Sequence, residues 1–258
     1  MVITEHFVYI HLPKTGGTFV ETVLSELLDK RNELFIDTSR QDDKLSLRVS
    51  NQHSPVSDIP EIDRSKKILF TVRNPYDHYV SFYEFGWWKL YPGDLFNEVR
   101  IREKYPHFPN INFEEWLVSN FDWRLLDSTH SESKIAKQIQ ESNMGPLTLD
   151  YVRFIFPCPE IVAANMKDNF EVVQLRKELP DIYFLHMENL NSELFKFLLS
   201  IDYNEQNIKF ILEKNKILPE GSHPRTLQSW IDYYTPELKE LVRKKERLIF
   251  EMFPEYDF

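Results

Sequence analysis

Residues 11–18, with the sequence HLPKTGGT, have the composition of an anion-binding turn. They follow the apolar segment Phe7–Ile10, which we expect to be a buried strand, and they lead into an amphipathic stretch expected to be helical from Thr18 to about Lys30. A turn of this kind presents backbone N–H groups and the positive end of the helix dipole to a ligand. The two glycines let the backbone approach an anion closely, and Lys14 adds a mobile positive charge. The pattern therefore predicts a site for a phosphate or phosphosulfate group.

The turn differs from a Walker A loop, in which the lysine follows the glycines as G-x-x-x-x-G-K-[ST]. In this sequence Lys14 precedes both Gly16 and Gly17. Thr15 does follow the lysine directly, as the hydroxyl ligand of Mg²⁺ does in a P-loop kinase or nucleotide hydrolase. Such an enzyme, and a non-catalytic nucleotide-binding protein, therefore remain alternatives.

A second phosphate-binding pattern follows a second apolar segment. Residues 68–72 are expected to form a buried strand, and Arg73 comes directly after it. Open α/β sheets bind their ligands at this end of the strands. Ser81, eight residues further on, lies in a helix expected from Tyr76 to Leu90 and can face back toward Arg73. A planar guanidinium with a hydroxyl suits a terminal phosphate.

The two patterns together resemble the signature of the PAPS-dependent sulfotransferases, where PAPS is 3′-phosphoadenosine 5′-phosphosulfate. Residues 13–18, PKTGGT, resemble the family's 5′-phosphosulfate loop, and residues 73–81, RNPYDHYVS, resemble its 3′-phosphate pattern R-[ND]-P-x-[DE]-x-x-x-S. Residues 184–190 resemble the family's strand followed by an E-[ND]-L turn. Residues 233–238 resemble the Y-T-P-E-L helix start that is common in carbohydrate-type members. The resemblance implies a sulfuryl transfer from PAPS.

The resemblance also implies a role for each matching residue. Lys14 would contact the bridging oxygen of the donor and steady the leaving group. Arg73 and Ser81 would bind the 3′-phosphate, and Arg225, in the loop before residues 233–238, would be a second ligand of that phosphate. The 5′-phosphate would be bound by backbone and hydroxyl donors of the loop: Thr15, Gly16, Gly17 and Thr18.

The acceptor must lose a proton as it attacks sulfur, so a base with a pKa near neutrality would help. His53 lies between the two phosphate motifs, where the resemblance to histidine-dependent polysaccharide O-sulfotransferases implies a catalytic histidine. A solvated loop histidine is the other interpretation of this residue. Glu21 and Glu84 are alternative bases if they turn inward, and His11 could support the loop. The sequence contains no H-E-x-x-H motif and no Cys/His set with ligand spacing, so we expect no metal.

The order of strands and helices predicts an α/β fold with a central parallel sheet flanked by helices, a three-layer sandwich like that of the P-loop NTPases. We expect a single domain over residues 1–258, with a variable acceptor-side insert at about residues 91–180. Further elements are expected as a strand at 182–185, as helices at 113–120, 131–141 and 191–199, and as a last helix capped by Thr235 and running to about Met252.

The composition excludes several classes of protein. The net charge of −10 argues against general nucleic-acid binding and makes a highly sulfated acceptor less favourable. No run approaches the roughly 18 apolar residues of a membrane span, and no targeting segment is evident, so we expect a cytoplasmic protein. The single cysteine, Cys158, permits no intrachain disulfide and is expected to be buried. A polysaccharide, a glycolipid, a small hydroxylated metabolite and a protein tyrosine all stay open as acceptors, with a hydroxyl or amine of a carbohydrate or small metabolite expected first. The oligomeric state stays open as well.

Overall fold

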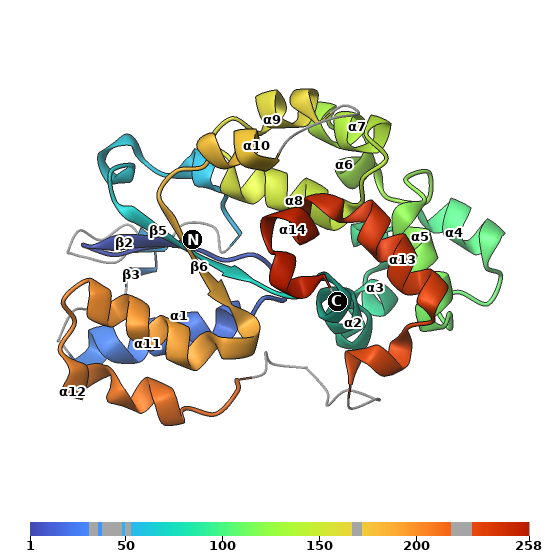
Figure 1. The fold of residues 1–258 in the computed structure, drawn as a ribbon. Helices are drawn as coiled ribbons and strands as arrows, with labels where there is room; N and C mark the ends of the chain where they lie inside the picture. The colour runs from blue at the N-terminus through green and yellow to red at the C-terminus, as the bar shows by residue number, and fades with distance from the viewer. Residues whose placement is uncertain (31–35, 38–47, 50–52, 167–171, 218–228, 258) are drawn as a thin grey trace. The chain divides into compact units, whose positions relative to one another are not determined.

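Figure 1 shows the fold in the computed structural model. The chain forms two compact units. The first unit comprises Met1–Arg73 and Leu179–Ser222, and the second comprises Asn74–Glu178 and His223–Phe258. The residues that the structure describes are 1–30, 36–37, 48–49, 53–166, 172–217 and 229–257. The expectation of one domain with an acceptor-side insert remains a prediction.

Within its described residues, the first unit contains a six-stranded sheet in the order β3-β4-β1-β2-β5-β6. The strands are β1 (Val2–Ile3), β2 (Phe7–Ile10), β3 (Ile36–Asp37), β4 (Arg48–Val49), β5 (Lys67–Val72) and β6 (Ile182–His186). Strands β2, β5 and β6 are parallel, with Tyr9 opposite Leu69 and Leu69 opposite Tyr183. Strand β1 is antiparallel to both of its neighbours. The largely parallel sheet of an α/β fold is therefore confirmed, with one antiparallel strand that the sequence did not predict.

The central strands are buried because nearly all of their side chains are apolar. All four residues of β2 are buried, and so are five of the six in β5. Helices α1 (Gly17–Lys30) and α11 (Leu190–Ser200) cover the same face of the sheet (Figure 1). The apolar sides of both helices share one hydrophobic core with β2. The core includes Phe7, Tyr9, Phe19, Val23, Leu194 and Phe197. Burial of each large apolar side chain contributes ~1.5–3 kcal/mol, so this layer holds the turn between β2 and α1 firmly in place.

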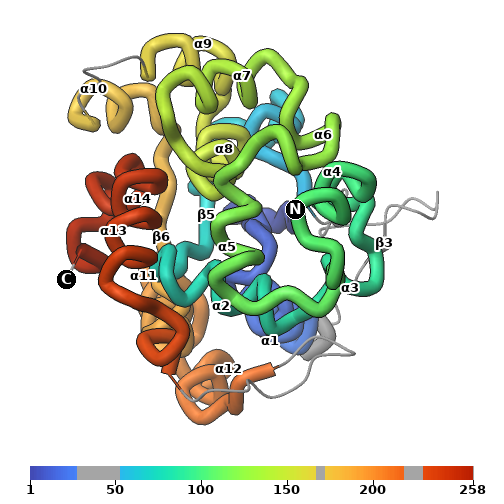
Figure 2. Tube along the Cα trace, turned by 90° about the vertical axis from the view of Figure 1, so that its right-hand side faces the viewer, coloured from blue at the N-terminus to red at the C-terminus, as the bar shows by residue number. Residues whose placement is uncertain are grey.

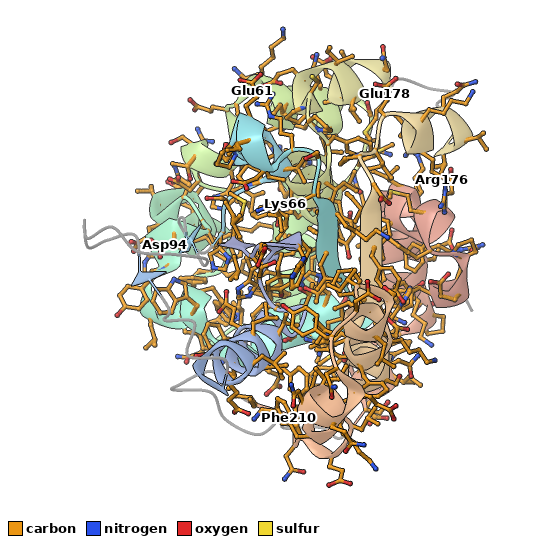
Figure 3. All side chains as sticks on the ribbon, turned by 90° about the vertical axis from the view of Figure 1, so that its left-hand side faces the viewer. Glu61, Lys66, Asp94, Arg176, Glu178 and Phe210 are labelled. Atoms are coloured by element: carbon orange, nitrogen blue, oxygen red, sulfur yellow. The ribbon has the colours of Figure 1, made fainter. Side chains whose placement is uncertain are left out.

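Lys66 anchors the beginning of β5 (Figure 3). Its Nζ donates to the carbonyl of Thr4 over 2.6 Å and pairs with Oδ1 of the buried Asp63 over 2.7 Å. Because this clamp lies at the amino end of β5, it helps to set the register that places Arg73 at the opposite end. The first unit is completed by the short helix α12 (Glu205–Ile208).

The described part of the second unit is helical. Its helices are α2 (Pro75–Phe85), α3 (Trp87–Leu90), α4 (Glu98–Lys104), α5 (Phe113–Phe121), α6 (Ser128–Ser131), α7 (Lys134–Glu141), α8 (Pro146–Ile155), α9 (Pro159–Asn165), α10 (Val172–Lys177), α13 (Pro236–Lys245) and α14 (Arg247–Met252). Figure 2 shows α7, α8 and α9 grouped together, as expected from the contacts among all three. No described helix of either unit has both the length and the apolar character needed to cross a membrane.

Glu246 is a fully buried carboxylate in the turn between α13 and α14. Its Oε2 accepts hydrogen bonds from the backbone N–H and the hydroxyl of Thr148, each over 2.7 Å, and its Oε1 accepts one from the Tyr79 hydroxyl. A Cβ at Gly145 would lie 2.0 Å from Oε1, so this carboxylate also requires a glycine before α8. Burial raises the pKa of Glu246 above its ordinary value, and the hydrogen bonds from Tyr79 and Thr148 oppose that shift.

Several elements agree with the sequence prediction. The predicted strands at 7–10, 68–72 and 182–185 are confirmed as β2, β5 and β6, and the helices at 113–120 and 191–199 as α5 and α11. The helix predicted at 131–141 is present as α7, which begins later, at Lys134, because Ser133 caps it. The side chain of Thr235 accepts a hydrogen bond from the N–H of Leu238, which confirms the predicted cap of α13.

Three predictions were wrong. The helix expected over residues 76–90 ends early because Gly86 adopts a left-handed conformation with φ of +69° and caps α2. The last helix does not continue unbroken to Met252, since Glu246 separates α13 from α14. Cys158 was expected to be buried and is exposed instead.

Candidate functional site

The turn between β2 and α1 has the backbone of an anion-binding site. Lys14 and Gly16 both adopt positive φ, of +66° and +93°. The first backbone bond of α1 is donated by Phe19 to the carbonyl of Gly16 over 3.0 Å. The N–H groups of Gly17 and Thr18 therefore lie ahead of the helical hydrogen-bond ladder, at the positive end of a 14-residue helix. This arrangement can bind a phosphate or a similar anion.

Both glycines of the turn are required by packing. Gly16 has a φ that side chains rarely adopt, and a Cβ there would lie 2.8 Å from Cδ2 of Leu190. A Cβ at Gly17 would lie 1.9 Å from Nε2 of His11. The turn is thus enclosed by the start of α11 on one side and by the His11 ring on the other. From the sequence, these glycines were expected only to let an anion approach the backbone closely. Their packing against Leu190 and His11 was not predicted.

Thr15 ties the turn to the sheet through a chain of hydroxyl groups. Its Oγ1 donates to the carbonyl of Leu12 over 2.7 Å and lies 2.6 Å from Oγ1 of Thr71 on β5. Oγ1 of Thr71 lies 3.3 Å from the hydroxyl of Tyr9. A hydroxyl has one hydrogen to donate, so Thr71 must donate to Thr15 and Tyr9 to Thr71. Thr15 is completely buried, so only its backbone N–H could contribute to an anion site.

Arg73 reaches the turn from the neighbouring strand. Because β2 and β5 are parallel, with Ile10 opposite Phe70, the segments that follow them emerge at the same edge of the sheet. Arg73 is only 3% exposed, and its Nη1 donates to the carbonyl of Lys14 over 2.7 Å. This bond uses one of the five N–H donors of the guanidinium. The structure therefore joins Lys14 and Arg73, the two residues that lead the two sequence motifs.

His53 lies beside the same turn, against His11. Its Nδ1 is 3.3 Å from the carbonyl of His11, and the two rings meet edge to face with their centroids 4.9 Å apart. A carbonyl can only accept, so Nδ1 of His53 carries the hydrogen and Nε2 of the neutral ring carries the lone pair. His53 as a whole residue is exposed to solvent. A histidine in this state can act as a base through Nε2.

The surroundings of His53 favour its neutral form. Partial burial of the ring is the largest cause of a lowered pKa, although the residue as a whole is exposed. The hydrogen bond to the His11 carbonyl and the charge of Glu21 raise this pKa, whereas positive charge on His11 and on the α-amino group of Met1 lowers it. The net shift is downward from the ordinary value of 6.5, so His53 is mainly unprotonated at pH 7.

Two His–Glu pairs that the sequence did not predict lie at this edge of the sheet. His11 Nδ1 lies 2.8 Å from Oε1 of Glu21 on α1. His186, opposite Val72 at the end of β6, has its Nδ1 3.2 Å from the carboxylate of Glu193 on α11. The sequence signal for both pairs was weak, because it consists only of a histidine at a strand end and a glutamate in the next helix.

The first unit brings together most of the predicted site residues that the structure describes: Lys14, Thr15, Gly16, Gly17, Thr18, His53 and Arg73. Ser81 lies half-buried in α2, which belongs to the second unit. Glu84, an alternative base, accepts a hydrogen bond from the Tyr233 hydroxyl over 2.6 Å within that same unit. Arg225 lies outside the described residues. Among the residues that are described, no three His, Cys, Asp or Glu side chains are grouped so that they could hold a metal ion.

Comparison with known proteins adds a similarity to solved structures. The sequence matches no family model and no curated protein. Among solved structures, the chain is similar to the mouse sulfotransferase SULT7A1 complexed with PAP, with a TM-score of 0.45 and 15% sequence identity. The match covers 93% of this chain and 84% of the mouse protein. A similarity of this degree does not by itself assign a function.

Proposed function

We propose that this chain is a sulfotransferase that moves a sulfuryl group from PAPS to a hydroxyl or amine of an acceptor and releases 3′,5′-ADP. The observation that carries the proposal is the hydrogen bond from Arg73 to the carbonyl of Lys14. It joins the motif that resembles a 5′-phosphosulfate loop to the motif that resembles a 3′-phosphate site, and it does so within one unit. PAPS has phosphates on both its 5′ and its 3′ side, so two linked anion sites suit this donor.

The 5′ side of the donor would be bound by the turn. The N–H groups of Gly16, Gly17 and Thr18, at the start of α1, would donate to the 5′-phosphate, with the backbone of Thr15 beside them. Lys14 would place its ammonium group at the oxygen that bridges phosphorus and sulfur. As the bond from sulfur to that oxygen breaks, Lys14 would stabilise the negative charge left on the nucleotide.

The acceptor side would be served by His53. Its Nε2 would take the proton of the acceptor group while a new bond forms between the acceptor oxygen or nitrogen and sulfur. The sulfated product then leaves, and the proton passes from His53 to water. The hydrogen bond from Nδ1 to the His11 carbonyl and the lowered pKa both support this role, because they leave Nε2 unprotonated near neutrality.

The 3′-phosphate would be bound by Arg73, with Ser81 and Arg225 as further ligands. Arg73 is 3% exposed, so the phosphate would meet the guanidinium at the small surface that it keeps, where a charged pair is screened less than in open water. No metal is needed in this proposal, since lysine, arginine and backbone N–H groups can stabilise the limited charge of a sulfuryl group. Residues at about 91–180 would form the acceptor side, and we expect a carbohydrate or a small metabolite as the acceptor.

A P-loop-like kinase or hydrolase is less well supported by the geometry. That chemistry needs the hydroxyl after the loop lysine as a ligand of Mg²⁺. Here the hydroxyl of Thr15 donates to Leu12 and accepts from Thr71 inside the sheet. A Thr15 in this state cannot bind Mg²⁺ without breaking the hydroxyl chain.

Titration calorimetry tests the donor, and labelled PAPS tests the reaction. We expect 3′,5′-ADP to bind without Mg²⁺ and more tightly than ATP, and we expect label to pass from PAPS to at least one class of acceptor in a screen of carbohydrates, phenols and amines. Tight binding of ATP that depends on Mg²⁺ would favour the kinase. Binding of 3′,5′-ADP without transfer to any acceptor would favour the non-catalytic protein.

A further inference from the structure

His11 contacts several parts of the candidate site at once. It is 5% exposed, and its Nδ1 is held by the carboxylate of Glu21 over 2.8 Å. One edge of its ring packs over Gly17 so closely that no side chain fits there. The same ring faces His53, and its own carbonyl accepts the hydrogen bond from His53. His11 therefore lies between the start of α1 and the proposed base.

The hydrogen bond from His53 to this carbonyl is 3.3 Å long, which is longer than the usual range of about 2.7–3.2 Å. It is too weak to fix an exposed ring by itself. The edge-to-face contact with the His11 ring supplies a second constraint on the plane of His53. The orientation of His53 thus depends on the orientation of the His11 ring.

The His11 ring is in turn oriented by its neighbours. Glu21 lies on α1, one helical turn after Gly17, and its side chain is 24% exposed whereas that of His11 is 6% exposed. An ionised carboxylate can only accept, so Nδ1 of His11 donates to it. On its other side, the ring of Tyr9 stacks on His11 with a centroid distance of 6.2 Å.

We propose that Glu21 and His11 form a positioning pair, which links the start of α1 to His53 and aims the Nε2 atom of His53 at the acceptor. The proposal rests on the proposed function only for the identity of the reaction. The pair makes no contact with the reacting atoms in this role. It sets the tautomer and the direction of the base, as partners that orient functional histidines do elsewhere.

Two variants distinguish the role of the hydrogen bond between Glu21 and His11 from the role of the His11 ring. Both are measured in the chain of residues 1–258. Glu21→Gln keeps the shape of the side chain and the His11 ring but removes the carboxylate. His11→Asn keeps an amide donor near the position of Nδ1 but removes the ring that His53 packs against. Glu26→Gln is the matched control, because Glu26 is also an ion-paired carboxylate on α1, with Nζ of Lys214 2.5 Å away.

The tautomer of His53 is followed by ¹⁵N NMR of labelled histidine, alongside the kcat of PAPS-dependent transfer and the Kd of 3′,5′-ADP. In the wild type we expect Nδ1 of His53 to carry the hydrogen. Both Glu21→Gln and His11→Asn should give a mixture of His53 tautomers and lower kcat by ~10- to 100-fold, the range typical of partners that orient a functional histidine. The Kd should change little in either variant, and Glu26→Gln should match the wild type throughout.

Three results would overturn the pairing. An unchanged His53 tautomer in both variants would show that the pair does not orient the base. A Glu21→Gln loss equal to that of His53→Ala, with the tautomer unchanged, would make Glu21 the base. Equal effects of Glu21→Gln and Glu26→Gln would indicate only a weakened helix. The NMR signal needs no turnover, so a wild type that transfers no sulfuryl group would refute the proposed function while the tautomer still decides the pairing.

Discussion

Arg73 donates a hydrogen bond from Nη1 to the carbonyl oxygen of Lys14 over 2.7 Å, and the residue that it holds is backbone-strained. Lys14 has a φ of +66°, which costs a non-glycine residue ~1–3 kcal/mol and persists only where the surroundings impose it. The buried guanidinium of Arg73 and the buried hydroxyl of Thr15 impose it from β5 and from within the turn. The shape of the proposed 5′ site therefore depends on a residue of the proposed 3′ site.

Arg73→Ala should weaken 3′,5′-ADP more than 5′-AMP, and it should weaken both. Loss of a charge-assisted contact to the 3′-phosphate costs on the order of 1.5–3 kcal/mol. 5′-AMP lacks that phosphate, so its smaller loss of affinity measures only the effect of releasing the Lys14 carbonyl. Calorimetry with both nucleotides checks the difference.

Arg64→Ala is a suitable control for Arg73, because Arg64 also donates to a carbonyl of the first unit, that of Ile59, over 3.3 Å. It should leave both affinities unchanged. If Arg73→Ala lowers the affinities for the two nucleotides equally, Arg73 acts only through the turn. An unaltered 5′-AMP affinity would mean that the bond to Lys14 does not shape the 5′ site.

Lys14→Ala should lower turnover far more than it weakens 3′,5′-ADP. The ammonium group is proposed to act on the bridging oxygen while the bond to sulfur breaks, which is an interaction of the transition state. Comparison of kcat with the Kd of 3′,5′-ADP decides this, and equal losses would make Lys14 a binding residue only. Lys14→Gly should be equally inactive but more stable to heat than Lys14→Ala, because glycine adopts the positive φ without strain.

His53→Ala should reduce transfer by ~100- to 10,000-fold, the usual contribution of a general base, and should leave the Kd of 3′,5′-ADP unchanged. In the wild type, kcat/KM should fall as the pH drops through the pKa of His53, because protonation of Nε2 removes the base. Burial lowers this pKa, so the fall should lie below pH 6.5. The groups that face His53 and set the exact position are His11, Glu21 and the α-amino group of Met1.

His6→Gln provides the control for this pH profile, since His6 is an exposed histidine of the same unit with 44% of its side chain accessible. It should reproduce the wild-type curve. A His53→Ala variant that keeps the acidic limb would show that another group titrates there, and the role would pass to Glu21.

The sequence predicted the parts of the fold whose signal is local. The apolar runs of β2, β5 and β6 are long enough to identify as strands, and Thr235 followed by proline identifies the start of α13. Strands β1, β3 and β4 have two residues each, too few to show any periodicity, so the antiparallel β1 was missed. The break after α2 did have a signal, Gly86, which was overlooked within an aromatic-rich stretch.

The sequence also indicated the two motifs of the candidate site but not their connection. The bond between Arg73 and Lys14 joins residues 59 positions apart, and no spacing rule predicts which N–H of a guanidinium meets which carbonyl. The buried hydroxyl of Thr15 shows the same limit, because a threonine in a phosphate-binding sequence suggests a ligand contact. The direction in which the Thr15 hydroxyl points depends on Thr71, which lies in another strand.

Glu246 should make the stability of the second unit depend on pH. Burial raises the pKa of this carboxyl above its ordinary value of 4.5, so the folded chain binds the proton more tightly than the unfolded chain does. The free energy of unfolding should therefore fall as the pH rises from about 4.5 through the folded-state pKa. The glutamine of Glu246→Gln cannot titrate. In urea denaturation at several pH values, the free energy of unfolding of this variant should therefore lack the fall with pH that Glu246 causes in the wild type.

Glu246→Ala separates charge from hydrogen bonding at the same place. It leaves the donors of Thr148 and Tyr79 buried without the carboxylate, and each unsatisfied donor costs ~1–3 kcal/mol at any pH. A wild type and a Glu246→Gln variant with the same pH slope would instead show that the pKa of Glu246 is the same in the folded and the unfolded chain, because the hydrogen bonds offset the effect of burial.

Gly17→Ala should disrupt the site through His11. The added Cβ would lie 1.9 Å from Nε2 of His11, so the ring must leave its place beside His53 and its bond to Glu21. Overpacking of this kind costs ~1–3 kcal/mol of stability, and both kcat and the affinity for 3′,5′-ADP should fall. Thermal unfolding, calorimetry and turnover of the same preparation measure the three effects.

The double variant Gly17→Ala with His11→Ser tests whether the clash is the cause. Removal of the ring makes room for the methyl group, so the double variant should be more stable than Gly17→Ala alone, a non-additive result expected only for residues in contact. Its turnover should stay low, because the ring that orients His53 is gone. Gly93→Ala is the control, since a Cβ there would meet Oε1 of Glu98 at an ordinary 3.4 Å. If Gly17→Ala behaves like Gly93→Ala, the His11 ring does not pack on the turn, and the link from α1 to His53 is lost with it.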